Sequence, residues 1–182
     1  EHVQALIKRR GLFPDMPPLH IENWPWSVKI FTLGRFGLVK DGKPVQFSGK
    51  VQKKPLSMLK VLITLGGRNV SEDQLMDILW FDADGDVAHN SFATTLYRLR
   101  KLIGNEKAIL LREGRITLDH RYCWVDVWAF ERILGQVDAA WKEGLAENKM
   151  TQTIQLSEKA VEMYKGPFLA GETDQPWTLS FR

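Results

Sequence analysis

Apolar side chains recur at helical spacing between residues 87 and 104, VAHNSFATTLYRLRKLIG. With an advance of 100° per residue, Leu96, Leu99 and Ile103 fall within about 40° of Phe92. A row of apolar residues on one face is typical of an amphipathic helix that buries this face in a core. The pattern therefore predicts a helix over this stretch.

The opposite face of the predicted helix is polar. It carries an amide, a hydroxyl, a phenol and two cations, on Asn90, Thr94, Tyr97, Arg98 and Lys101. Residues 87–104 contain no Asp or Glu. Such side chains can hydrogen-bond base edges and phosphates of DNA. An ordinary solvated helix face has a similar composition, so the helix alone leaves both interpretations open.

Period-two alternation predicts two small sheets on either side of the helical region. Residues 28–47 alternate apolar and polar positions and contain Asp41-Gly42, which is typical of a tight hairpin turn. Residues 108–112 and 115–118 alternate in the same way and predict a second hairpin. Residues 123–127 predict a further strand or an extended connection.

Two more helices are predicted between these sheets. Pro55 suits the first turn of a helix that ends at Gly66-Gly67. Ser71 followed by Gln74 fits a capping box, which predicts the start of a second helix that runs to about residue 80.

The last third of the chain has helical spacing throughout. Residues 129–145 and 150–164 each carry an apolar row, and their short connection predicts a helical hairpin. A helical pair at the end of a chain leaves apolar surface open, so we expect further helices against it, as in a helical repeat domain.

The N-terminal residues predict no domain of their own. Residues 1–10 fit the end of a helix, and residues 11–26 hold four prolines, which indicates an extended linker. We interpret Trp24 and Trp26 as covering an edge of the core, because exposed tryptophans are uncommon.

Charge is distributed unevenly along the chain. The formal net charge is +3. Residues 28–118 hold 15 Lys or Arg against 9 Asp or Glu, whereas residues 129–164 hold 4 against 6. The basic part is the candidate for binding a polyanion.

Cysteine and hydropathy patterns bear on location. Cys123 is the only cysteine, so an intramolecular disulfide is excluded and a reducing compartment is favoured. No segment approaches the roughly 20 apolar residues of a membrane span. We expect a cytoplasmic location, no membrane partner, and a chain that is part of a longer protein.

Metal, cofactor and catalytic interpretations find little support. Calcium is not expected at residues 82–86, because an EF-hand counted from Asp82 would need Gly and Glu where Val87 and Ala93 stand. His120 and Cys123 lack a second pair of zinc ligands. No nucleophile elbow or phosphate loop is present, so we expect no cofactor and no enzyme activity.

Five segments carry a resemblance to a known family. They are IFTLGRFGLVKDGKPV, KKPLSMLKVLITLGGRNVSEDQLMDILW, ATTLYRLRKLIG, WVDVWAFERIL and YKGPFL. In this order they resemble the OmpR/PhoB-type winged-helix domain of the Streptomyces antibiotic regulatory protein family, followed by the start of its bacterial transcriptional activator domain. LGGRNVSEDQLMDILW and LDHRYCWVDVWAFE resemble modules attached to large MalT-like regulators.

The resemblance implies an α+β winged helix-turn-helix with a small N-terminal antiparallel sheet, three helices and a C-terminal β-hairpin wing. An all-α helical hairpin of the TPR type would follow. The implied divisions are residues 1–27 for a helical remnant and linker, 28–128 for the winged helix, and 129–182 for a partial activator domain.

The resemblance also implies roles in sequence-specific binding of double-stranded DNA by a bacterial transcriptional regulator. The third helix would enter the major groove, where the expected base contacts are Asn90, Thr94, Tyr97 and Arg98. The expected phosphate and wing contacts are Lys53, Lys54, Arg100, Lys101, Arg112 and Arg115. Arg100 lies about 80° from the core direction, so a salt bridge at the buried edge is an equal alternative for it.

Two other partners belong to this picture. In related regulators the loop before the third helix can touch RNA polymerase; here that loop contributes Phe81, Asp82, Asp84 and Asp86. The alternative function is an interaction module that keeps the winged-helix fold, docks onto other domains of a larger parent protein and binds no DNA usefully. The carboxylate-free face of the third helix favours DNA, and the apolar residues around Trp124 leave room for the alternative.

Overall fold

The computed structural model describes residues 2–47, 53–142 and 147–171. It has a mixed α+β fold that divides into two compact units. Among the described residues, unit 1 combines residues 2–44 with 123–142 and 147–171, and unit 2 comprises residues 45–47 and 53–122. The two segments of unit 1 therefore precede and follow unit 2 in the described sequence.

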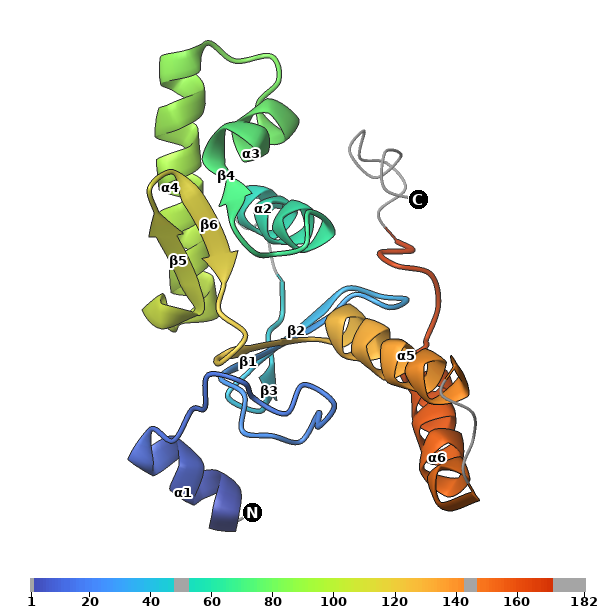
Figure 1. Ribbon diagram of the computed structural model, residues 1–182. Coiled ribbons are helices and arrows are strands. Elements are labelled where there is room, and N and C mark those ends of the chain that lie inside the picture. The colour runs from blue at the N-terminus through green and yellow to red at the C-terminus, as the bar shows by residue number, and fades with distance from the viewer. Residues whose placement is uncertain (1, 48–52, 143–146, 172–182) are drawn as a thin grey trace. The chain divides into compact units, whose positions relative to one another are not determined.

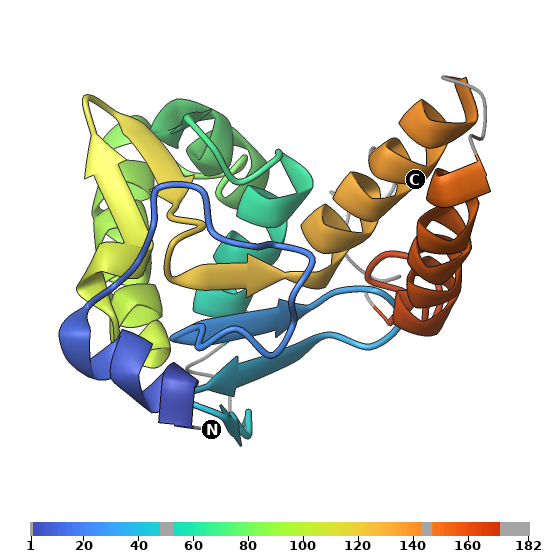
Figure 2. The same ribbon diagram turned by 60° about the horizontal axis from the view of Figure 1, so that its bottom comes forward.

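Unit 1 contains a four-stranded sheet in the order β3-β2-β1-β7 (Figure 2). The strands are β1 (Val28–Phe31), β2 (Gly37–Lys40), β3 (Lys43–Pro44) and β7 (Cys123–Val125). β1 pairs antiparallel with β2 and parallel with β7, so a strand from the last third of the chain completes the N-terminal sheet.

The turn between β2 and β3 confirms the predicted hairpin. Asp41 and Gly42 both have positive φ, 48° and 80°. Two successive residues of this kind make the twist of a two-residue turn match that of the strands, and Asp-Gly is favoured there. The parallel pairing of Val28 with Cys123 was not predicted, because nothing in either segment identifies the other.

Three helices belong to unit 1: α1 (His2–Arg10), α5 (Asp126–Lys142) and α6 (Glu147–Met163). α5 and α6 pack against each other, which confirms the predicted helical pair. A buried cluster joins the linker to this helical part through Leu19, Trp26, Trp124 and Ala129. The indole N–H of Trp124 donates to the carbonyl of Leu19 at 2.8 Å, so the linker is held in place.

A buried carboxylate joins the end of β1 to the start of α5. Asp126 is 4% exposed and accepts four hydrogen-bond donors. These are the amide and hydroxyl of Thr32 and the amides of Leu33 and Val127, at 2.6–2.9 Å. The first residue of α5 is therefore fixed to the sheet.

Unit 2 contains three α-helices and a three-stranded sheet in the order β4-β6-β5 (Figure 1). The elements are α2 (Lys53–Thr64), β4 (Val70–Ser71), α3 (Glu72–Leu79), α4 (Gly85–Ile103), the 3-10 helix η2 (Glu106–Ala108), β5 (Ile109–Arg112) and β6 (Arg115–Leu118). β4 pairs with β6, so the hairpin becomes part of a larger sheet.

The three helices predicted in unit 2 are present, but two details differ. α4 begins at Gly85, inside the stretch 81–86 that was expected to be a loop. α2 ends before Gly66-Gly67, and the amide of Gly67 donates back to Leu62 at 2.8 Å. Ser71 is the N-cap of α3, but its side chain makes no capping hydrogen bond, so the capping box predicted with Gln74 is wrong. Ser71 instead continues β4, where it is the partner of Arg115.

The predicted divisions at residues 28 and 128 do not coincide with the compact units. Residues 28–44 and 123–128 belong with α5 and α6, whereas residues 45–122 form a unit with the three helices and the hairpin. Whether residues 28–128 fold as a separate domain stays a prediction. The described part of residues 129–182 contains the helical pair, and its TPR character also stays a prediction.

Candidate nucleic-acid interface

α4 holds the candidate site on a firmly packed base. Phe92, Leu96, Leu99 and Ile103 are all less than 4% exposed, which confirms the predicted buried face. The helix ends at Gly104, which adopts the left-handed conformation at φ 72°, a common C-cap for glycine.

The face opposite this row is open to solvent. All the expected base-contacting side chains are exposed: Asn90, Thr94, Tyr97 and Arg98. The ammonium of Lys101 lies 4.7 Å from the centroid of the Tyr97 ring, a cation–π contact one turn apart. The structure thus brings an amide, a hydroxyl, a phenol and two cations onto one exposed helix face.

Arg100 lies at the edge of this face and bonds within the protein. Its guanidinium donates to the carbonyl of Ile109 at 3.1 and 3.3 Å, which ties α4 to the start of β5. The acceptor is a backbone carbonyl and not a carboxylate, so this bond is not the salt bridge that was the alternative for Arg100. A phosphate contact by the remaining donors of Arg100 stays a prediction.

A hollow of about 670 Å³ lies beside this link, between α4 and β5. Its lining includes Tyr97, Arg100 and Lys101 from α4 and the strand residues Leu110 and Leu111. Sequence reasoning did not find it, because it depends on where the hairpin returns relative to the helix. A local sign of it is Leu111, an apolar residue directly before Arg112 that is 37% exposed.

The hairpin carries two exposed arginines next to its turn. The predicted pairing is confirmed, and Arg112 and Arg115 stand directly opposite each other. The turn residues Glu113 and Gly114 have positive φ, 49° and 68°. Arg115 donates to the carbonyl of Asn69 at 3.3 Å, whereas Arg112 extends the positive charge at the hairpin tip.

The two lysines at the start of α2 differ in their surroundings. Both are exposed. The ammonium of Lys54 donates to the carbonyl of Leu79 at 2.5 Å and lies 5.2 Å from the ring centroid of Trp80. Lys54 therefore caps the C-terminal end of α3. Phosphate contacts by Lys53 and Lys54 stay predictions.

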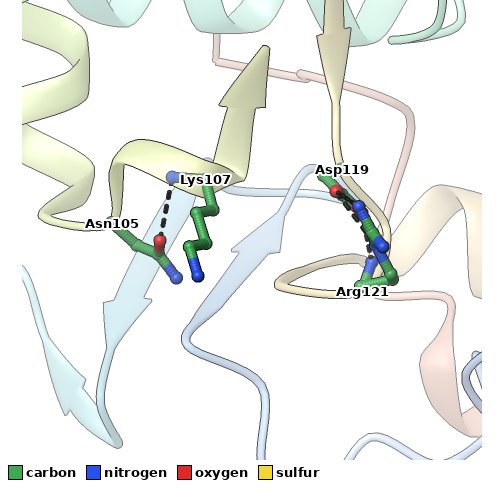
Figure 3. A network of polar contacts seen from close by, with 4 residues as sticks. All are labelled: Asn105, Lys107, Asp119 and Arg121. Carbon is green, nitrogen blue, oxygen red and sulfur yellow. Dashed lines mark hydrogen bonds and ion pairs between the residues drawn. The ribbon is translucent and has the colours of Figure 1, made fainter. Parts of the chain in front are cut away.

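Polar contacts fix both ends of the hairpin (Figure 3). At the entrance, the side chain of Asn105 accepts from the amide of Lys107 at 3.0 Å. At the exit, Asp119 forms an ion pair with Arg121 at 2.7 Å. Burial of Asp119 acts to raise its pKa, but hydrogen bonds and charge from Arg121 outweigh this and hold the pKa below its ordinary value. These contacts therefore fix the backbone just before β5 and just after β6.

The loop between α3 and α4 is acidic and aromatic. Phe81 is 78% exposed, and Asp82 and Asp84 are exposed in the same loop, whereas Asp86, expected in the loop, is exposed in the first turn of α4. Such a surface suits a cationic protein partner. Contact with RNA polymerase stays a prediction.

Within the described residues, no group of three or more His, Cys, Asp or Glu could hold a metal ion. Cys123 is completely buried in β7. None of the described helices is long and apolar enough to cross a membrane.

One curated protein and one solved structure are similar to this chain. The chain is 31% identical over 90 residues to "Transcriptional regulator HilA" of Salmonella typhi, a match that covers 48% of this chain and 16% of HilA. The fold is similar to the structure "Mycobacterium tuberculosis EmbR in complex with low affinity phosphopeptide", with a TM-score of 0.63 and 22% identity over 85% of this chain. No protein-family model matches the chain.

The matches support part of the expected resemblance. The likeness to EmbR shows a shared mixed α+β fold. The similarity to HilA is distant and covers about half of the chain. The chain spans about one sixth of HilA and 40% of the EmbR chain. Neither match supports the expected attachment to a MalT-like regulator.

Proposed function

We propose that this chain is the DNA-binding part of a bacterial transcriptional regulator that recognises a specific double-stranded sequence. In this proposal α4 enters the major groove, and the β5–β6 hairpin lies as a wing on the flanking groove. The relative that is named a transcriptional regulator supports the biological role, which no residue of the chain could indicate by itself.

The exposed face of α4 carries the proposal. Asn90, Thr94 and Arg98 recur at three- to four-residue spacing on one side of the helix, and all are exposed. A helix fits the major groove, where an amide can read adenine and a guanidinium can read guanine through paired hydrogen bonds. After Asp86 in its first turn, α4 holds no carboxylate that would repel the DNA backbone.

Phosphate contacts would orient this helix. Lys101 on α4 and the hairpin arginines Arg112 and Arg115 provide exposed cations on two separate elements of unit 2. Contacts of this kind set the register of a protein on DNA but do not read its sequence. Because these DNA contacts are few, we expect one copy of the chain to bind DNA weakly. The DNA target should therefore contain two repeated sites.

Selection from a randomised duplex library at about 100 mM salt, with sequencing of the bound DNA, tests the proposal. We expect an enriched motif. Arg98→Ala should lose about 1–3 kcal/mol of discrimination at one base pair of that motif. Arg68→Ala is the matched control, because it removes an exposed cation of unit 2 that lies outside α4 and the hairpin.

The alternative function predicts a different result. An interaction module without useful DNA binding would yield no motif, and salt-sensitive binding without a motif would also support it. The exposed loop residue Phe81 favours an added protein partner under either function, and RNA polymerase is the one we propose. Phe81→Ser should then reduce transcription activation without changing the enriched motif.

A further inference from the structure

One apolar side chain is exposed at the start of the polar face of α4. Val87 is 55% exposed and lies in the first turn of the helix. The sequence pattern drew attention to the polar side chains of this face and left Val87 out. Single exposed apolar residues are ordinary on protein surfaces, so exposure alone indicates no ligand. The place of Val87 on the helix is what distinguishes it.

Val87 continues the row of proposed base-contacting side chains toward the start of the helix. With an advance of 100° per residue, Val87 lies within about 20° of both Thr94 and Arg98. The amide of Ala88 donates to the carbonyl of Asp84 at 2.8 Å, so the first turn is closed and this spacing applies from its beginning. From Val87 to Arg98 the row runs for about 16 Å along the helix axis.

The first turn of α4 is a suitable place for a base contact. In helix-turn-helix proteins the N-terminal residues of the recognition helix contact base edges. Asp86 precedes Val87 but lies about 100° away around the helix, outside the row. A carboxylate in the first turn is stabilised by the positive end of the helix dipole, so Asp86 has a role within the helix itself.

The chemistry of the valine side chain selects one base. Valine presents methyl groups and has no hydrogen-bond donor or acceptor. In the major groove, thymine presents a methyl group at C5, which apolar side chains contact. Cytosine presents an amino group nearby, and a valine would remove water from it without replacing the lost hydrogen bond. An apolar side chain in this row therefore favours thymine over cytosine.

We propose that Val87 contacts the 5-methyl group of a thymine and thereby determines one base pair of the DNA target. The inference rests on the proposed function, because it requires α4 to lie in the major groove. Val87 precedes Asn90 and Arg98 along the helix. The thymine should therefore lie outside the DNA segment between the base pairs that Asn90 and Arg98 contact.

Replacement of thymine by uracil tests this contact, because uracil lacks only the 5-methyl group. Selection from the randomised duplex library supplies the motif, and each thymine of the motif is then replaced in turn. Fluorescence anisotropy should show one replacement that weakens binding by the unmodified chain about fourfold, the effect expected for one methyl group. With Val87→Ala, the same replacement should weaken binding less than about 1.5-fold, because the contact is already lost.

Two control variants should keep the fourfold effect of uracil. Val87→Ile retains the methyl groups at the contact. Val161→Ala removes the same groups from a position in α6 that is 76% exposed and lies in unit 1. Alanine favours a helix more than valine does, and Val87 is exposed, so Val87→Ala should fold. An unchanged circular dichroism spectrum verifies this.

The outcomes separate this inference from the proposed function. Absence of any enriched motif would overturn both. A motif in which no uracil replacement weakens binding would overturn only the role of Val87. The same holds if the sensitive thymine lies between the base pairs whose selection is lost with Asn90→Ala and Arg98→Ala.

Two further results would assign the contact elsewhere. A fourfold effect of uracil that persists with Val87→Ala would show that another side chain contacts the methyl group. If Val87→Ala also reduces transcription activation, then Val87 belongs with Phe81 to a surface that contacts a protein. Either result would overturn the inference and leave the proposed DNA binding intact.

Discussion

A single buried carboxylate holds the start of α5 to the sheet of unit 1. Asp126 accepts donors from both segments of the chain that build this unit. A buried acceptor of this kind is costly to remove, because its former donors lose their partners and cannot reach water.

We predict that Asp126→Asn lowers the free energy of unfolding by about 2–3 kcal/mol, because an amide group would face backbone N–H donors. Urea denaturation followed by tryptophan fluorescence measures the change. Asp138→Asn, at an exposed position of the same helix, is the control and should have almost no effect. Equal stability of the Asp126 variant would mean that the four hydrogen bonds contribute little.

Asp119 makes the stability of unit 2 depend on pH. Its pKa lies below the ordinary value because Arg121 stabilises the charged form. A lowered pKa in the folded state stabilises the fold above the unfolded pKa of about 4, and this contribution disappears as the pH falls through the folded pKa.

We therefore predict that Asp119→Asn destabilises the chain near pH 7 and that the gap to the unmodified chain narrows below about pH 4. Denaturation curves of both proteins at a series of pH values test this. A gap that stays constant from neutral to acid would show that the charge of Asp119 contributes nothing, leaving only its shape and hydrogen bonds.

At the scale of elements, the positive charges of the β5–β6 hairpin oppose its stability. Arg112 and Arg115 face each other across the strands, and like charges in directly opposed positions destabilise a hairpin. The pair of opposed arginines lowers the stability of the hairpin and concentrates positive charge on it. DNA binding explains such a pair more easily than folding does.

Arg112→Ala should therefore reduce DNA binding without harming the fold. We predict a free energy of unfolding that is unchanged or a few tenths of a kcal/mol higher, since the repulsion is relieved. The slope of log affinity against log salt should become shallower by about 0.9. Lys43→Ala removes an exposed cation from unit 1 as a control. An unchanged slope for Arg112→Ala would remove the hairpin from the proposed interface.

The elements that the sequence predicted well are those whose signals are local. The helix α4 follows from four apolar residues at helical spacing and a glycine at its end. The two hairpin turns follow from Asp-Gly and Glu-Gly pairs at positions of positive φ. Each of these features acts within a few residues, so a pattern in the chain is enough to reveal it.

The features that the sequence did not reveal depend on contacts between distant residues. The parallel pairing of β1 with β7 and the bond from Arg100 to Ile109 both require knowledge of where the chain returns. The exposed polar face of α4 was expected from its pattern, but whether Asn90 or Arg98 contacts a base depends on DNA, which lies outside the chain.

At the scale of the whole molecule, the two units divide the chain differently from the expected winged-helix domain. A fragment of residues 45–122 keeps the three helices and the hairpin together. A fragment of residues 28–128 adds the sheet of unit 1 but removes the linker and most of α5 and α6, which cover Trp124.

We predict that residues 45–122 fold cooperatively and bind little of the hydrophobic dye ANS, whereas residues 28–128 expose the Trp124 cluster and bind the dye strongly. Exposed apolar surface is the physical cause. Dye fluorescence and thermal unfolding of both fragments measure it. A stable 28–128 fragment with no dye binding would favour the expected divisions instead.

The parallel pairing of β1 with β7 also has a consequence for synthesis of the protein on the ribosome. The amide of Thr32, at the end of β1, donates to the carboxylate of Asp126, which is synthesised 94 residues later. Synthesis proceeds at about 5–20 residues per second. For roughly 5 to 20 s, β1 and the linker tryptophans have therefore been synthesised while β7 and α5 have not. A two-stranded hairpin is marginally stable alone. The helices and hairpin of unit 2 leave the ribosome complete during this interval, so the part proposed to bind DNA is able to fold before the sheet of unit 1 is complete.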